Sequence, residues 1–529
     1  MRLGVGAARR PLGTVDSDRR EGVERELVWS CAGEPMYRHL ALIALLGAVY
    51  ELQFLYEPVN PVDEGWPLYA ASRLIEGGVL YDDTFFVFPP GHLLSAWVAR
   101  SIDPPGFVAA RCIYGFFNVA VALSLYLLGR RLMAPHLALL AALMVVFAGP
   151  SVHSLHNLFG FRYLVWAILA LLAFGRHLDS DERCWLFVAG AAAGVAVAFR
   201  LTPGFAALAS IGLGCLVSRR AALGRLADLA AFAVGFAVVI LPVLAWATSG
   251  VELATIWREV VVRPVVMTER QSLPVPWLGA KGPGAASFVA LQFWFYPALL
   301  VGYGVGLTHA AVRAWRGRGV SPDPLRIAVW AFAAVYFARS LGRADVSHLL
   351  SALPPLCLLS VDAASRLFPW LASPRRGHLA AFAILVLWVA AWGSAGSFVP
   401  MARDLLPLPA SDARRWSDQR TALQATEREA RAVLDSGVEP RILLDLSARP
   451  SLYLLGTFVG PGYADVVMPG TFMDAQEEAR FLSRLREAPP EGVFWPSRPF
   501  DGQPQRDVSK TAPAVTAWAR GFYSPESAD

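Results

Sequence analysis

The stretch NPVDEGWPLYAASRLIEGGVLYDDTFFVFPPG (residues 60–91) follows the first strongly apolar segment of the chain. It carries two pairs of adjacent acidic residues, Asp63-Glu64 and Asp82-Asp83, among aromatic residues, prolines and glycines. The spacing of its apolar residues predicts a short amphipathic helix over about 67–76, and Gly77-Gly78 predict a turn after it. A segment that only connected two helices would not need so many specified side chains, so we interpret this stretch as a functional loop.

The composition of the whole chain indicates a membrane protein. Hydrophobic residues make up 55% of the 529 residues and charged residues 17%, which is unlike an ordinary soluble domain. Apolar runs of about twenty residues, the length that crosses a bilayer as a helix, recur over about the first four hundred positions. Because a helix satisfies its backbone hydrogen bonds within one segment, we predict a polytopic α-helical membrane protein with about eleven transmembrane helices.

The order of apolar segments and arginines predicts a topology. The predicted spans cover residues 40–56, 107–128, 137–152, 158–174, 185–199, 204–217, 229–248, 288–312, 327–341, 346–361 and 379–398. The segments 185–199 and 204–217 are short and meet around Arg200, so the number of spans there stays open. Arginines collect in every second connection, and positive residues concentrate on the cytoplasmic side. We therefore expect the N-terminus in the cytoplasm and the chain after residue 398 outside it.

Three regions follow from this pattern. Residues 1–39 are a polar cytoplasmic tail, residues 40–400 the transmembrane domain with 57–105 as its first extracytoplasmic loop, and residues 401–529 a small extracytoplasmic α/β domain. In the last region we predict the following elements: a helix over 412–435, strands over 441–446 and 492–495, a short helix over 450–455, and a helix that begins at Asp474 with Glu477 completing a capping box.

Charged side chains from several connections are expected to face the same side as Asp63 and Glu64. They are His153, His156, Arg162, Arg200, Arg258, Arg263, Arg270, Lys281, Arg339, Arg343, Asp345 and His348. Charges at membrane depth are costly and usually functional. Arginine binds phosphate through its planar fork, and a carboxylate can take a proton from a hydroxyl group. The set therefore suits a lipid-phosphate-linked donor and an acceptor hydroxyl.

Each of these groups also has a structural explanation. Asp63 and Glu64 could form a solvated loop corner or a helix N-cap. Arg343, Asp345 and His348 could be an ion pair that anchors a turn. Arginines on an interfacial helix often contact lipid headgroups nonspecifically, and histidines often stand at helix ends. The residues alone leave these alternatives open.

The loop resembles a known family over about thirty residues. The order of Asp63-Glu64, a small-residue helix, Tyr81-Asp82-Asp83 and Pro89-Pro90-Gly91 is similar to the first extracytoplasmic loop of GT-C glycosyltransferases. The likeness is to the bacterial relatives of the protein O-mannosyltransferases and of the lipid A aminoarabinose transferase. Elsewhere in the chain the resemblance is architectural, so it implies a GT-C-like transmembrane domain.

The resemblance implies a glycosyltransferase that takes a sugar from a polyprenyl-phosphate donor at the outer face of the bacterial inner membrane, with inversion at the anomeric carbon. It implies Asp63 as the catalytic base or a metal ligand, with Glu64 beside it. The substrate would contact Tyr81, Asp82, Arg258, Arg263, Arg270, Arg343, Asp345 and His348. A divalent metal is compatible with this mechanism, although the sequence identifies no ligand set. The expected partners are the lipid-linked donor, a lipid, glycan or protein acceptor and membrane lipids, but not nucleic acid.

Two other functions compete with this interpretation. A transporter or flippase of lipid-linked glycans often contains matched broken helices in two repeats, and the break near Arg200 has no matching break in a second half. An O-antigen ligase or polymerase would have its large functional loop late in the bundle, whereas the acidic loop here comes first. The sugar and the acceptor cannot be identified from the sequence.

Overall fold

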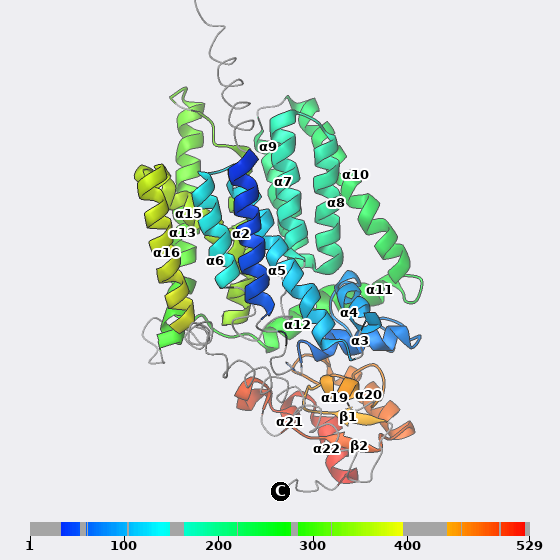
Figure 1. Cartoon of the computed structure of the whole chain (residues 1–529). Coiled ribbons are helices and arrows are strands. Elements are labelled where there is room, and N and C mark those ends of the chain that lie inside the picture. Colours follow the sequence, from blue (N-terminus) through cyan, green and yellow to red (C-terminus); the bar gives the residue numbers. More distant parts are fainter. Residues whose placement is uncertain are drawn as a thin grey trace, which may run out of the picture.

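The computed structural model describes residues 33–52, 55, 60, 62–102, 105–148, 163–218, 221–276, 284–318, 320–394, 442–455, 458–496 and 499–523. Figure 1 shows a bundle of long helices and, below it, a smaller unit formed by the C-terminal segment, which we define as residues 442–523. The first 32 residues of the predicted tail and the helix predicted over 412–435 lie outside the described residues.

Each predicted apolar segment overlaps a helix of the bundle. These helices are α2 (Gly33–Leu52), α5 (Phe107–Gly129), α6 (Pro135–Phe147), α7 (Leu164–Ser180), α8 (Cys184–Phe199), α9 (Leu201–Val217), α10 (Ala222–Ala247), α13 (Gly284–Trp315), α14 (Pro324–Ser340), α15 (Val346–Leu367) and α16 (Pro374–Ser394). Among the described residues, 5 helices are long and apolar enough to cross a membrane by length and composition, and they are α5, α10, α13, α15 and α16. The largely helical, membrane-type fold is therefore confirmed, while the full number of spans stays a prediction.

Small side chains allow the helices of the bundle to approach closely. Helix α8 packs against both α7 and α10, and its Ala189, Ala193 and Ala196 are fully buried. Arg200 separates α8 from α9 because its backbone is extended, with φ −160° and ψ 132°. The two short segments predicted on either side of Arg200 are thus two separate helices joined by one extended residue.

A layer of shorter helices lies between the bundle and the C-terminal segment (Figure 1). It consists of α3 (Gly65–Ile75), α4 (Gly91–Ile102), α11 (Leu253–Trp257), the π-helical turn η2 (Arg258–Val262) and α12 (Arg263–Arg270). Helix α3 confirms the helix predicted over 67–76, whereas α4 was not predicted. At the opposite end of the bundle, the 3₁₀ turn η3 (Pro369–Ala372) connects α15 to α16.

The C-terminal segment is a small α/β unit. Its strands β1 (Leu443–Asp445) and β2 (Gly492–Phe494) pair in parallel, with Leu443 opposite Gly492. The helices and turns are α19 (Ser451–Leu455), α20 (Ala475–Glu487), η4 (Phe500–Gly502), η5 (Pro504–Arg506), α21 (Val508–Thr511) and α22 (Pro513–Phe522). Phe481 and Leu485 of α20 and Val515 of α22 are buried in its core. Both predicted strands and the helices predicted at 450–455 and from Asp474 are therefore confirmed.

The C-terminal segment contacts the acidic loop directly. The Tyr463 N–H donates to the Asp83 carbonyl at 3.2 Å, and the rings of Tyr69 and Tyr453 stack with their centroids 4.6 Å apart. The approach is close, since a Cβ added to Gly65 would lie 2.5 Å from the Ser451 nitrogen. The first loop and the last part of the chain therefore form one packed surface below the bundle.

Candidate functional site

Glu64 is buried and paired with an arginine of the bundle. Its two carboxylate oxygens accept from Arg111 Nε at 2.6 Å and Arg111 Nη2 at 2.7 Å. The Asn60 N–H also donates to Glu64 at 2.8 Å. This pair fixes the start of α3 to α5. Because the Arg111 guanidinium occupies both oxygens of the Glu64 carboxylate, we assign Glu64 to positioning the loop.

Asp63 occupies the turn that precedes α3 and is partly exposed. The Asn60 side chain caps this turn, because its Oδ1 accepts from the N–H groups of Val62 at 3.2 Å and Asp63 at 3.0 Å. The turn is thus fixed on one side by Asn60 and on the other by the buried Glu64. Asp63 is therefore a carboxylate on a rigid corner of the loop, as a general base requires.

The aromatic residues of the loop form a continuous wall from α3 to the bundle. Trp66 donates from Nε1 to the Phe85 carbonyl at 2.9 Å, and its ring lies 5.9 Å from that of Phe88. Phe88 stacks on His92 at 4.7 Å, and the Arg200 guanidinium lies 4.6 Å from the centroid of Phe88. The wall therefore leads from the helix that follows Asp63 to the break between α8 and α9.

Tyr81 and Asp82 do not join Asp63 in a common polar group. Tyr81 is buried, has a positive φ of 70° and donates its hydroxyl to the Phe88 carbonyl at 2.6 Å. Asp82 is exposed. The neighbouring Asp83 instead stabilises the turn, since it accepts from the Val79 N–H at 2.7 Å. We therefore assign Tyr81 to the fold of the loop, while the role of Asp82 as a substrate ligand stays a prediction.

Arg200, Arg339 and Arg343 form what we call the arginine cluster. The Arg339 guanidinium lies 6.0 Å from the centroid of Tyr336 and donates to the Ser351 hydroxyl at 3.2 Å. The Ser351 hydroxyl in turn donates to the His348 carbonyl at 2.7 Å, and Arg200 acts electrostatically on the same Tyr336. The extended backbone at Arg200 places its buried side chain beside Tyr163 as well, 5.5 Å from that ring. A guanidinium group from α14, one from the extended residue between α8 and α9 and one from the turn before α15 thus lie at the loop-bearing end of the bundle.

The turn before α15 holds the third member of this cluster. Arg343 Nε donates to Asp345 at 2.7 Å, and Asp345 caps α15 by accepting from the His348 N–H at 2.9 Å. His348 Nδ1 lies 2.8 Å from the same carboxylate oxygen. Burial would raise the pKa of Asp345, but hydrogen bonds from His348 and Arg343 lower it to about 2. Asp345 therefore remains a carboxylate at neutral pH and orients both Arg343 and His348.

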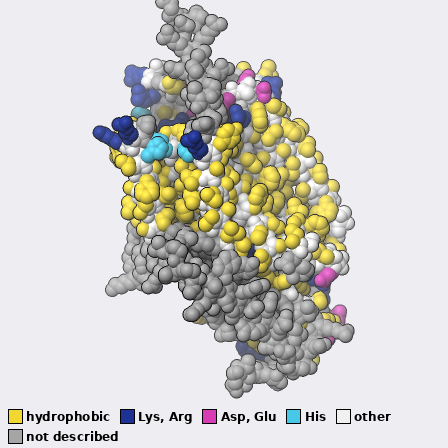
Figure 2. Space-filling view, in the orientation of Figure 1, with side chains coloured by type: hydrophobic (Ala, Val, Ile, Leu, Met, Phe, Trp, Pro, Cys, Tyr) yellow, Lys and Arg dark blue, Asp and Glu magenta, His cyan; other side chains and the backbone are white. Residues whose placement is uncertain are grey.

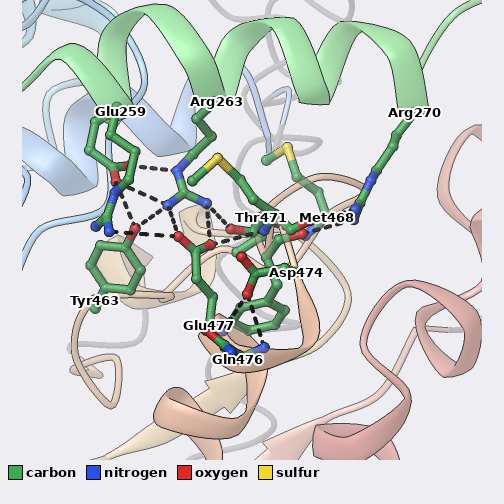
Figure 3. A network of polar contacts seen from close by, with 12 residues as sticks. Glu259, Arg263, Arg270, Tyr463, Met468, Thr471, Asp474, Gln476 and Glu477 are labelled. Atoms are coloured by element: carbon green, nitrogen blue, oxygen red, sulfur yellow. Dashed lines mark hydrogen bonds and ion pairs between the residues drawn. The ribbon is translucent and has the colours of Figure 1, made fainter. Parts of the chain in front are cut away.

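Arg263, one of the predicted phosphate ligands, is enclosed between α12 and the C-terminal segment (Figure 3). Its guanidinium donates to Glu259 at 2.5 and 2.9 Å and to Glu477 at 3.0 and 3.1 Å. It also donates to the Tyr463 hydroxyl at 2.6 Å and to the Thr471 carbonyl. All of its donors are occupied, so the structure contradicts the predicted role, and Arg263 is a link between the two parts of the chain.

The two neighbours of Arg263 contact the same unit. Arg270 donates to the carbonyls of Phe472 at 2.8 Å and Met473 at 2.7 Å. Arg258 pairs with Glu259 at 3.1 Å while its side chain is 40% exposed. The predicted capping box also differs: Asp474 caps α20, but Glu477 bonds the Met473 N–H and Arg263 instead of the cap. Of the three arginines predicted in this connection, Arg258 and Arg270 retain open surface, whereas Arg263 is fully buried.

Four predicted site residues cannot be placed. They lie outside the described residues and are His153, His156, Arg162 and Lys281. The part of the chain that the structure describes contains no group of three or more His, Cys, Asp or Glu residues that could hold a metal ion, so we propose no ligand set for one. Sequence reasoning missed His92, Tyr163 and Tyr336, although a polar side chain at each position within apolar sequence was the available signal.

The helical bundle, the acidic loop and the docked C-terminal unit together define a largely helical fold of the membrane type. The structure is similar to that of ArnT from Cupriavidus metallidurans, both bound to undecaprenyl phosphate and in the apo state. The bound form has a TM-score of 0.53 at 18% identity, covering 87% of this chain and 90% of that chain. The apo form has a TM-score of 0.52 at 18% identity, covering 85% and 89%. The chain therefore has the fold of ArnT, and the fold expected from the loop is confirmed.

The comparisons give three further findings. A weaker likeness, with a TM-score of 0.43 at 14% identity, is found to the apo oligosaccharyltransferase of Archaeoglobus fulgidus, covering 68% of this chain and 56% of that one. No protein-family model matches the sequence, and no curated protein matches it.

Proposed function

We propose that this protein is an integral-membrane glycosyltransferase that moves a sugar from a polyprenyl-phosphate donor to an acceptor of the cell envelope. The observation that supports it best is the ArnT fold, which extends over 87% of the chain. The neighbour with that fold was crystallised with undecaprenyl phosphate. The loop corner at Asp63 and the arginine cluster supply the two chemical groups that such a transfer needs.

In the proposed reaction, an acceptor hydroxyl oxygen forms a bond to the anomeric carbon, and the bond from that carbon to the phosphate oxygen breaks. Asp63 takes the hydroxyl proton as general base. The leaving polyprenyl phosphate carries the bonding electrons, and Arg200, Arg339 and Arg343 stabilise its charge through fixed hydrogen-bond donors. Asp345 and His348 orient Arg343 within that site. Attack opposite the leaving group inverts the anomeric centre.

We further propose that the C-terminal segment and the acidic loop face the outside of the bacterial inner membrane, with the N-terminus in the cytoplasm. The alternation of arginine-rich connections supports this orientation. Alkaline phosphatase fused after Ser411 is expected to be active, and the same enzyme fused after Arg220 is expected to be inactive. An inactive fusion after Ser411 would contradict the orientation.

The function is tested by a deletion strain whose envelope glycans and lipids are compared with the parent by mass spectrometry. One sugar modification should be missing, and the wild-type gene should restore it. Asp63→Asn should not, because loss of a general base costs about a hundred- to ten-thousand-fold in rate at nearly unchanged volume. Glu76→Gln is the matched control, because this carboxylate lies in the same loop, its side chain is 57% exposed, and it forms a 3.8 Å ion pair with Arg73.

Restoration by Asp63→Asn at wild-type protein levels would refute the assigned base. The flippase alternative predicts a different result, in which purified protein moves the lipid-linked glycan across liposomes and forms no glycosidic bond.

A further inference from the structure

A cavity with an unusual charge environment lies at the end of the bundle opposite the acidic loop. It has a volume of about 470 Å³ and is lined by Trp370, Ser373, Arg375 and Arg376, where η3 leads into α16. Helix α15 has 22 residues and separates this cavity from the Arg343 turn by about 33 Å. Figure 2 shows basic and histidine side chains gathered at that upper end, above a broad surface of hydrophobic side chains.

The two arginines of the cavity differ from their neighbours in having no acidic partner. Arg366, on the preceding helix, pairs with Asp362 at 2.9 Å, and Arg326 lies 3.6 Å from the same carboxylate. Within the described part of the chain, neither Arg375 nor Arg376 makes an ion pair or a hydrogen bond, and both are exposed. Their positive charge is therefore available to an external anion.

Ser373 lines the same cavity. Its hydroxyl oxygen is inaccessible to solvent, and within the described residues it has no hydrogen-bond partner. A buried hydroxyl without a partner costs free energy, so rotation of this side chain toward a ligand in the cavity would be favoured. The two guanidinium forks of Arg375 and Arg376 already suit the oxygens of a phosphate group, and the rotated hydroxyl would add a third donor.

The wall of the cavity is fixed by contacts to the bundle. His136 of α6 is buried, its Nε2 lies 2.8 Å from the Leu371 carbonyl, and its ring stacks on His378 with centroids 4.5 Å apart. A Cβ on Gly377 would lie 2.5 Å from the His136 Nε2, so the first turn of α16 can approach only because this residue is glycine. The arginines therefore extend from a backbone held in one position.

The surroundings of the cavity distinguish a lipid from a soluble anion. Leu367, Phe368, Leu379 and Phe382 are large apolar side chains that are exposed next to it. Helix α16, which carries Leu379 and Phe382, is among those apolar enough to cross a membrane. Aromatic and cationic side chains at the same depth along a membrane helix are typical of the bilayer interface. A phosphate held by Arg375 and Arg376 would thus have acyl chains lying along α16.

We propose that this cavity binds the phosphate headgroup of an anionic phospholipid in the leaflet opposite the candidate active site. The site lies at the other end of the bundle from the proposed sugar transfer and is independent of it. Basic pockets between membrane helices recognise anionic headgroups through the same chemistry.

The test measures lipid binding to the purified full-length protein in detergent. Phosphatidylglycerol is titrated while the melting temperature and the lipid retained in native mass spectrometry are recorded. Arg375→Gln/Arg376→Gln should lower the apparent affinity for phosphatidylglycerol at least tenfold. Arg316→Gln/Arg318→Gln removes the same charge from exposed positions at the same end and should bind like the wild type. Arg375→Lys/Arg376→Lys keeps the charge without the fork and should be intermediate.

Three outcomes would overturn the proposal. Equal phosphatidylglycerol affinity of the two glutamine variants would show that the cavity is not the site. Equal binding of phosphatidylcholine would show that net lipid charge is not recognised. Stabilisation of lipid-free protein by inorganic phosphate, lost in Arg375→Gln/Arg376→Gln, would assign the cavity to a soluble anion. Should Arg375→Gln/Arg376→Gln melt earlier than the wild type even without lipid, the affinity of Arg375→Lys/Arg376→Lys for phosphatidylglycerol decides, because this variant preserves the local charge. An intermediate affinity supports the site, and an affinity equal to that of the wild type overturns it.

Discussion

The link between α12 and the C-terminal segment yields a quantitative prediction for Arg263→Met. The side chains of Arg263, Glu259 and Glu477 are 0%, 1% and 6% exposed, so methionine would leave two carboxylates buried without their cation. Breaking a buried ion pair by removing one partner typically costs about 3–5 kcal/mol. The cost should be local, because these contacts join the C-terminal segment to the rest of the chain.

Hydrogen exchange of the intact protein in detergent measures this local opening. Peptides that contain Tyr463 and Glu477 should lose about two to three orders of magnitude of protection, since each 1.4 kcal/mol is about tenfold. Peptides from the bundle core should change little. Arg258→Met is the matched control, because its side chain is 40% exposed and pairs with the same Glu259; an exposed pair contributes about 1 kcal/mol or less.

A charge-removal series tests the physical reason. Adding Glu259→Gln and Glu477→Gln to Arg263→Met should recover part of the lost protection, because the uncompensated charges are then gone. Protection of Arg263→Met within threefold of the wild type would refute the assignment of Arg263 as a link. A loss of protection that the glutamine substitutions do not reduce would refute the electrostatic explanation.

Two further variants test single groups. Burial raises the pKa of Asp465 from its usual value of 3.8 to about 6 in the folded protein. The folded state therefore holds this proton more tightly than the unfolded state. As a result, the free energy of unfolding falls as pH rises from about 4 to about 6. Asp465→Asn should remove this part of the pH dependence and add up to about 3 kcal/mol at pH 7, and a melting-temperature profile that matches the wild type from pH 4 to 7 would contradict it. Arg343→Lys should raise the apparent KM for the lipid donor, because the bidentate fork is lost; unchanged donor dependence with a lowered melting temperature would make this turn structural.

Local signals in the sequence predicted local structure well. The apolar periodicity gave α3 within two residues at its start, and Asp474 caps α20 as its residue type indicates. The break between α8 and α9 at Arg200 was indicated by a charged residue and a nearby proline between two apolar runs. Helix α4 was missed because its 12 residues lie within the segment that was interpreted as one extracytoplasmic loop, directly after Pro89-Pro90.

The partners of charged residues could not be predicted, because they are distant in sequence. Glu64 pairs with a residue 47 positions away, and Arg263 pairs with one 214 positions away. From the sequence alone, Glu64 and Arg263 looked as available for chemistry as Asp63 and Arg343. Only the packing of the C-terminal segment against α12 shows that Arg263 has no donor left for a substrate.

The contact between the first loop and the last part of the chain has a consequence for biogenesis. The Tyr69 hydroxyl accepts from the Gly460 N–H across 391 positions, so the loop leaves the ribosome long before its binding surface is made. During synthesis, Glu259 can pair with Arg263 across one helical turn, while Glu477 is added 214 positions after Arg263. The loop that carries Asp63 therefore acquires its final support only after residues 442–523 are made, and a nascent chain without them would present an incompletely supported site.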